Sequence, residues 1–120
     1  MIPGNFEGNI PYIPVMILHG GGVAAPFFVL DTGFTGDLLI TSQMARELGI
    51  APSGFGSIIL AGGGSVTAAI GKTRAMLGDD PKDVEVVIAD GMPLAGISLF
   101  TKFRCKILVD CNQRTVEVEN

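Results

Sequence analysis

The chain has 120 residues, of which 48% are hydrophobic, and a formal net charge of −4 at pH 7. This length supports one compact core, so residues 1–120 are expected to form a single domain. The negative charge argues against nucleic acid or an anionic membrane as a partner. No apolar run approaches the roughly 18 residues that cross a bilayer, and the start of the chain lacks a basic and apolar leader, so we expect a cytoplasmic protein.

Short apolar runs separated by glycine and proline begin the chain, a pattern typical of β-rich folds. Strands are expected at 12–19 and 27–30, with a hairpin turn at the triple glycine 20–22 between them. Pro14 lacks a backbone N–H and restricts the first strand to a sheet edge or to an irregular start.

One short helix is expected after a further strand at 38–40. Thr41 or Ser42 can cap its first turn with a side-chain oxygen. Gly49 can end it, because glycine readily adopts the left-handed conformation found after helix C-termini.

A glycine-rich hairpin is expected in the middle of the chain. Extended segments at 57–60 and 66–77 flank residues 61–65, which read Ala-Gly-Gly-Gly-Ser. Glycines at such a tip permit positive φ values and offer few side-chain contacts, so a mobile tip is expected.

The C-terminal third is expected to contain a strand at 84–88, a short helix at 97–103, and two strands at 105–109 and 115–118 around a hairpin turn. Cys105 and Cys111 fall in this region, and six extended residues would separate them by about 20 Å, beyond disulfide reach. We therefore expect two thiols in a reducing compartment and no metal site.

The strongest chemical signal is the segment 28–36, which reads Phe-Val-Leu-Asp-Thr-Gly-Phe-Thr-Gly. Asp31 directly follows an apolar strand, where burial and backbone donors can be arranged around its carboxylate. Gly33 lets the chain turn back tightly beside it. Asp31 is therefore the candidate catalytic residue.

This pattern resembles the active-site signature of the retropepsin-like aspartic peptidases, a family with retroviral and single-domain bacterial members. The glycine-rich hairpin falls where that family has its flap, formed here by Ala61, Gly62, Gly63 and Gly64. A second hydrophobic-glycine element of the family is similar to Leu94, Ala95 and Gly96. Some likeness spans roughly residues 10–118, although only the Asp-Thr-Gly segment is specific.

The resemblance implies a mostly β fold: a small closed or partly closed barrel with one or two short helices and a flap hairpin. It also implies an aspartic endopeptidase that needs no cofactor and is active as a homodimer, with Asp31 from each subunit. Two carboxyl groups at short range cannot both ionise easily, because their negative charges would repel. One carboxyl therefore stays protonated while the other takes a proton from the attacking water.

The resemblance assigns supporting roles as well. Thr32 would brace the paired loops across the two subunits, and Gly33 would leave room for the substrate backbone. Thr35 would support the carboxylate loop through its hydroxyl. The flap would close over a peptide or protein substrate bound in an extended conformation.

Two departures from the family pattern motivate an alternative function. The flap has no acidic residue where bacterial relatives often read Ala-Asp-Gly, and Ala95 is smaller than the usual residue at its position. The alternative is a catalytically silent peptide-binding or assembly module with the same fold.

Other ionisable residues are expected to have structural roles. Asp37, Asp90 and Asp110 lack an Asp-Thr-Gly context and are expected in turns or at the surface, so the second carboxylate must come from a second subunit. His19 is the only histidine, and no nucleophile surrounds it in the sequence, so it is expected in a turn or at the surface.

Overall fold

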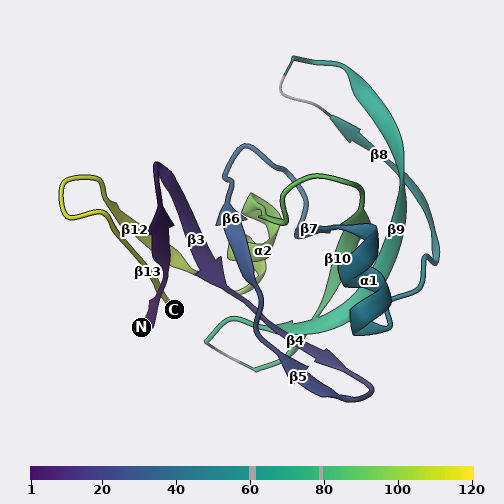
Figure 1. The fold of residues 1–120 in the computed structure, drawn as a ribbon, viewed down its shortest axis with the longest axis horizontal. Coiled ribbons are helices and arrows are strands. Elements are labelled where there is room, and N and C mark those ends of the chain that lie inside the picture. The colour runs from purple at the N-terminus through teal and green to yellow at the C-terminus, as the bar shows by residue number, and fades with distance from the viewer. Residues whose placement is uncertain (60–61, 79) are drawn as a thin grey trace.

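The structure is a computed structural model that describes residues 1–59, 62–78 and 80–120. Strands dominate it and two short helices are present in the described residues, as expected from the sequence (Figure 1). The helices are α1 (Ser42–Leu48) and α2 (Ile97–Lys102). The strands are β1 (Ile2–Pro3), β2 (Asn5–Glu7), β3 (Ile10–Pro14), β4 (Met16–His19), β5 (Gly22–Ala24), β6 (Phe27–Leu30), β7 (Leu38–Ile40), β8 (Gly54–Ile59), β9 (Ser65–Met76), β10 (Lys82–Ile88), β11 (Leu94–Ala95), β12 (Lys106–Asp110) and β13 (Thr115–Glu119).

The larger of two sheets curls around the core as an open half-barrel (Figure 1). Its ten strands follow the order β2-β3-β6-β11-β7-β10-β9-β4-β5, with β8 paired to β9 off this path, among the described residues. Most neighbouring strands are antiparallel, while β7 with β10 and β6 with β11 are parallel. The parallel pair of β6 and β11 brings two distant parts of the sequence together at the middle of the sheet.

The prediction of one continuous strand at 12–19 is wrong, because the segment is divided at Val15 into β3 and β4. β3 pairs with β6, whereas β4 pairs with β5 and β9 at the far end of the sheet. Pro14 cannot donate a ladder hydrogen bond, and Val15 is fully buried in the core. The chain therefore changes neighbours at the proline, which is the irregularity that Pro14 indicated.

The helix α1 is confirmed, and its ends match the expected caps. The Thr41 hydroxyl accepts a hydrogen bond from the Met44 N–H at 3.1 Å. Gly49 ends the helix with φ 70° and ψ 28°, the left-handed conformation that glycine adopts without a steric penalty.

The glycine-rich hairpin is also confirmed. β8 and β9 pair antiparallel from Gly54 opposite Ile70 to Ile59 opposite Ser65. The predicted flap residue Ala61 and the predicted strand residue Leu60 lie outside the described residues. In Figure 1 the hairpin projects from the body of the molecule.

A second, three-stranded sheet joins the two ends of the chain in the order β1-β13-β12. The β12–β13 hairpin was expected, but β1 and β2 were not, because such short strands carry no periodic pattern. Gly4 lies between β1 and β2, and its N–H donates to the Val116 carbonyl at 2.7 Å. Cys111 is exposed at the turn after β12, Cys105 is half-buried, and both are thiols.

The core is one cluster that both sheets and both helices help to form. It includes Ile13, Phe28, Leu38, Val86, Leu99, Phe103 and Val118, all of which are almost completely buried. Burying each such side chain contributes roughly 1.5–3 kcal/mol of hydrophobic free energy. Among the described residues, neither helix is long and apolar enough to cross a membrane.

Candidate active site

Asp31 lies at the point where β6 ends at the middle of the curled sheet. Its backbone N–H donates to the Ala95 carbonyl at 3.0 Å, which extends the pairing of β6 with β11 by one residue. The Phe34 N–H donates back to the Asp31 carbonyl at 3.1 Å and closes a tight turn. The sheet and the turn therefore fix the backbone on the two sides of Asp31.

The side chain of Asp31 is half-buried, and the turn itself supplies a donor to it. The Gly33 N–H donates to Asp31 Oδ1 at 3.0 Å. A Cβ placed on Gly33 would lie only 3.3 Å from the same oxygen, so glycine permits this close approach. One carboxylate oxygen is thus held by backbone, as expected for a group that must keep a fixed orientation.

The predicted second hydrophobic-glycine element packs against this turn. Leu94 and Ala95 form β11, which lies between β6 and β7. The Gly96 N–H donates to the Asp37 carbonyl at 2.9 Å, and the Ile97 N–H donates to the Phe34 carbonyl at 2.9 Å. The structure therefore brings together two segments that lie about sixty residues apart in the sequence.

Gly96 has no room for a side chain. A Cβ at this position would meet the Gly36 carbonyl oxygen directly and lie 2.7 Å from the Phe34 carbonyl oxygen. Any larger residue would push α2 away from the loop 31–37. This contact explains why glycine follows the two apolar residues of β11.

The predicted supporting threonines are exposed. Among the described residues, neither the Thr32 nor the Thr35 hydroxyl has a hydrogen-bond partner within the chain. The roles expected for them stay predictions about an assembled dimer. Gly62, Gly63 and Gly64 are exposed at the end of the β8–β9 hairpin, where Gly63 has φ 89°.

Asp37 has a role that the sequence did not reveal. Asp37 lies in the loop as expected. It is only 4% exposed, so it does not have the surface position that was the other expectation. Its Oδ2 accepts from Lys102 Nζ at 2.5 Å and from the Glu85 N–H at 2.9 Å, while Oδ1 is buried and has no hydrogen-bond partner among the described residues. No sequence pattern links positions 37, 85 and 102, because only the fold brings β10 and α2 to the loop.

The other ionisable candidates occupy turns. Asp110 is exposed at the end of β12 and accepts from the N–H groups of Asn112 and Gln113 at 2.9 Å each. Asp90 is exposed after β10. His19 ends β4, and its Nδ1 accepts from the Gly21 N–H at 3.3 Å. In the described part of the chain, no hydrogen bond or ion pair joins these side chains to Asp31.

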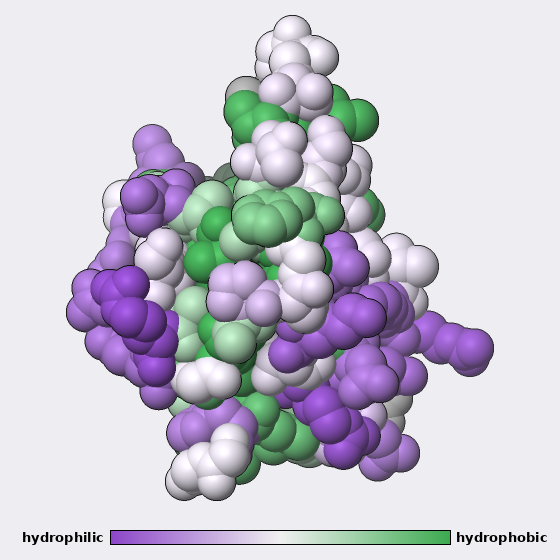
Figure 2. Space-filling view, turned by 90° about the vertical axis from the view of Figure 1, so that its right-hand side faces the viewer, coloured by the Kyte–Doolittle hydropathy of each residue, from purple (hydrophilic) through white to green (hydrophobic). Residues whose placement is uncertain are grey.

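The β8–β9 hairpin carries large exposed apolar side chains, namely Phe55, Ile59 and Val66. Figure 2 shows hydrophobic surface on this projecting part of the molecule. Isolated exposed apolar residues are common, but several on one projecting hairpin indicate a surface that contacts something else.

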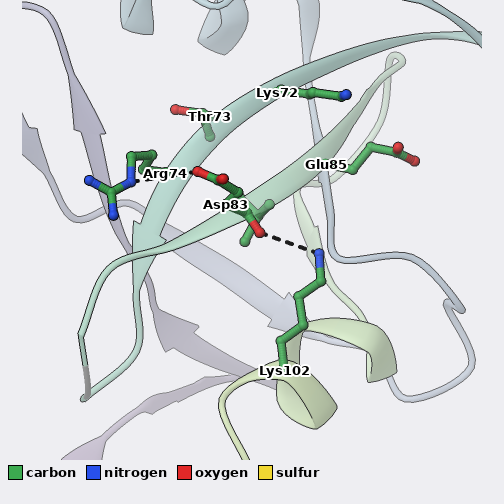
Figure 3. Close-up of a pocket in the computed structure, with 7 residues that line it drawn as sticks. Lys72, Thr73, Arg74, Asp83, Glu85 and Lys102 are labelled. Atoms are coloured by element: carbon green, nitrogen blue, oxygen red, sulfur yellow. Dashed lines mark hydrogen bonds and ion pairs between the residues drawn. The ribbon is translucent and has the colours of Figure 1, made fainter.

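A hollow of about 490 Å³ lies on a different face, between β9, β10 and α2 (Figure 3). It is lined by Lys72, Thr73, Arg74, Asp83, Val84, Glu85 and Lys102. Its charges are largely paired, since Arg74 lies 3.6 Å from Asp83 and Lys102 binds Asp37. Asp31 does not line this hollow.

Comparison with known proteins supports the fold. No protein-family model matches the sequence, and no curated protein matches it. Among solved structures, a retropepsin-like aspartic protease from Rickettsia conorii superposes with a TM-score of 0.63 over 100% of this chain and 91% of that chain. The fold is retropepsin-like. Because the two sequences are only 18% identical, the likeness establishes the fold class and leaves the chemistry to the residues themselves.

Proposed function

We propose that the chain is an aspartic endopeptidase, active as a homodimer in which each subunit contributes Asp31. The placement of Asp31 carries this proposal: its carboxylate follows β6, receives the Gly33 N–H and lies on a backbone anchored to β11. The retropepsin-like fold supports it. In this proposal residues 1–120 form one domain and supply half of the site, in a cytoplasmic protein.

The chemistry requires two carboxylates, and this chain presents one at the site. In the proposed dimer the two Asp31 side chains share one proton and hold a water molecule between them. The ionised carboxylate takes a proton from the water as it attacks the peptide carbonyl. The protonated carboxyl donates its proton to the developing oxyanion, which gives a gem-diol. The carboxyl that took the proton of the water then passes a proton to the leaving nitrogen as the C–N bond breaks, and a gem-diol hydroxyl returns a proton to the other carboxylate, so the pair acts as base and acid in turn.

The neighbouring residues have proposed roles that fit their exposure. Thr32 is exposed beside the carboxylate, where its hydroxyl can bond to the second subunit. Gly33 has no side chain to obstruct a substrate backbone, and Thr35 supports the loop once the dimer has formed. Gly62 to Gly64, with Ala61, form a flap that closes over the peptide and excludes water.

The proposed substrate is a peptide or protein segment in an extended conformation. An extended peptide can form backbone hydrogen bonds to a hairpin strand, as in strand addition, and the flap is a hairpin of this kind. Side-chain preference would then come from the surfaces around the paired loops.

Peptide cleavage by matched variants tests the proposal. We would incubate a broad peptide library with wild type, Asp31→Asn and the control Asp90→Asn, with and without a transition-state-mimicking inhibitor of aspartic peptidases. Wild type and Asp90→Asn should cleave, because Asp90 is exposed after β10 and has no role in the proposed reaction, and Asp31→Asn should not. Equal cleavage by Asp31→Asn would overturn the proposal.

The second candidate is a catalytically silent peptide-binding or assembly module. The flap favours it, since Gly62 to Gly64 present no acidic side chain to a substrate. Binding of a peptide that is never cut, with an affinity unchanged in Asp31→Ala, would support the module over the enzyme.

A further inference from the structure

The ten-stranded sheet ends at β5, and this strand has a partner on one side only. In the order of the sheet β5 pairs with β4, and no strand of the described chain lies on its other side. Residues 20–30, which include β5 and β6, contain no charged residue. An open edge is a template for pairing with another strand, and natural proteins commonly protect such edges with charged side chains or cover them.

The free side of β5 presents the backbone groups of Val23 and Ala25. The Val15 N–H donates to the Pro26 carbonyl at 3.2 Å, so the carbonyl of Pro26 points toward β3 and β4. Successive residues of a strand direct their N–H and C=O groups to opposite sides, so those of Ala25 and Val23 point away from β4. Among the described residues, no backbone hydrogen bond outside the strand ladders uses them. These groups are therefore available to a further strand.

The outer face of the same edge is an apolar strip formed by Met16, Val23, Ala25 and Phe27. The side chains of Met16, Val23 and Phe27 are 40%, 55% and 48% exposed, and Ala25 is exposed as well. Alternation places residues 23, 25 and 27 on one face, while Phe28 on the opposite face is buried in the core. A row of exposed apolar side chains along one edge indicates a surface that contacts something else.

A hollow of about 350 Å³ lies where this edge meets α1. Its lining is apolar except for one carboxylate, and consists of Ala24, Ala25, Pro26, Met44, Glu47 and Leu48. Met44 and Leu48 are four residues apart, so they share one face of α1. Glu47 accepts from Gln43 Nε2 at 3.0 Å, and no cation pairs with it in the described part of the chain. The hollow therefore suits an apolar chain that carries a positive charge.

We propose that residues 22–25 are a docking edge for an extended segment of another protein, which adds as a strand beside Val23 and Ala25. One face of the segment is apolar and continues the apolar strip. Its other face enters the hollow, where a lysine or arginine lays its apolar stem along Met44 and Leu48 and brings its charge to Glu47. Backbone hydrogen bonds supply affinity in such strand addition, and the hollow supplies the side-chain preference.

A second copy of β5 lacks what this site requires. On the face that meets the hollow, β5 offers only Gly22 and Ala24, which are too small to fill it. It also has no basic residue for Glu47. A foreign segment with a lysine or arginine at an inward position supplies both the volume and the charge.

The docking edge is separate from the candidate active site. The docking edge precedes β6 and Asp31 follows it, so the two lie at opposite ends of one strand (Figure 1). The lining of the hollow includes none of the residues proposed for catalysis or for the flap. The inference therefore does not depend on the proposed peptidase chemistry.

An NMR titration of the isotope-labelled chain with the synthetic peptide acetyl-Lys-Val-Lys-Val-Lys-Val-amide tests the proposal. The amide signals of residues 22–25 and of α1 should shift, and the Val23 and Ala25 amides should exchange more slowly with solvent. The matched peptide acetyl-Glu-Val-Glu-Val-Glu-Val-amide should bind at least about fivefold more weakly, because it brings like charge to Glu47. Shifts confined to the loop 31–37, to the flap or to the other edge strand β2 would contradict the proposal, as would equal binding of the two peptides.

A backbone variant tests strand addition directly. Val23→Pro removes an N–H on the free side of β5 and leaves the ladder with β4 intact, so the dissociation constant of the lysine peptide should rise about fivefold. Val23→Thr keeps this N–H and should bind within about twofold of wild type. Equal affinity of Val23→Pro and Val23→Thr would exclude pairing at this edge. Thermal unfolding checks that both variants fold.

A charge variant decides the result if Val23→Pro does not fold. Glu47→Gln should raise the dissociation constant of the lysine peptide about threefold. Glu7→Gln makes the same change at an exposed position of β2 and should bind like wild type, which controls for general attraction between the peptide and an acidic protein. Equal affinity of these two variants would refute the role of Glu47 and the proposal with it.

Two further measurements separate the alternatives. Sedimentation equilibrium that shows self-association abolished by Val23→Pro, with no binding of the peptide, would assign the edge to a second copy and contradict the proposal. Mass spectrometry checks that the peptide stays intact, and Asp31→Asn replaces wild type in the titration if the peptide is cut. Docking without cleavage would support the edge and leave the peptidase proposal to its own test.

Discussion

Asp31 and Asp37 stand at the two ends of one loop, and the fold places their carboxylates in opposite environments. The carboxylate of Asp31 is half-buried and, among the described residues, receives a hydrogen bond only from the nearby Gly33 N–H. Asp37 is buried and held by Lys102 and the Glu85 N–H, which come from α2 and β10. A carboxylate that reacts must stay accessible, whereas one that positions a loop must be enclosed. In the proposed enzyme, the loop 31–37 therefore divides chemistry and positioning between two identical side chains.

The largest expected effect is on catalysis at the Asp31 end. Asp31→Asn keeps the shape of the side chain and an oxygen for the Gly33 N–H, but it removes the shared acid-base group. The value of kcat/KM should fall by about 10⁴-fold. Urea unfolding should give a free energy within about 0.5 kcal/mol of wild type. A large loss of stability would mean that Asp31 is a structural residue like Asp37.

The next effect is on stability at the Asp37 end. Asp37→Ala removes the partner of Lys102 and the acceptor of the Glu85 N–H, and it opens a small cavity beside α2. We expect the free energy of unfolding to fall by about 3 kcal/mol. The exposed Asp90→Ala is the control and should change it by less than about 0.5 kcal/mol. Equal stability of the two variants would show that the buried pair contributes nothing.

A smaller loss of stability is expected from Lys102→Met, which leaves Asp37 buried without its cation. The side chain of Lys102 is 40% exposed, so water screens part of the interaction, and we expect a loss of about 2 kcal/mol. Thermal unfolding can measure it against Lys72→Met, which removes a charge from the same surface. The double variant Asp37→Asn/Lys102→Met should lose less unfolding free energy than the two single variants lose together. Strictly additive losses would contradict a direct interaction between the two side chains.

The smallest effect is expected at Thr32. Thr32→Val should leave the unfolding free energy of the isolated subunit within about 0.5 kcal/mol, because the hydroxyl has no partner within the described chain. If Thr32 bonds across the dimer, the loss of about 1 kcal/mol should raise the dimer dissociation constant roughly fivefold. An unchanged dissociation constant would remove Thr32 from the interface.

Local sequence signals predicted most of the fold. Both helices were found from capping residues and apolar spacing, and the β8–β9 hairpin was found from its glycine-rich turn. The turn at 20–22 was also expected, but it joins β4 to β5 and not to the strand at 27–30. The short strands β1, β2, β5 and β11 were not recognised as strands, because two or three residues carry no measurable periodicity. Their pairing depends on distant neighbours, as with β11 between β6 and β7.

The candidate site was predicted only in part, because some of its contacts also depend on distant neighbours. The sequence by itself determined that Asp31 follows an apolar strand and that a glycine two residues later lets the backbone turn toward it, since both are local properties of the chain. Only the tertiary structure decided that β11 anchors this turn and that Asp37 is buried against Lys102. Those contacts join residues more than sixty positions apart, and no local preference of the chain specifies them.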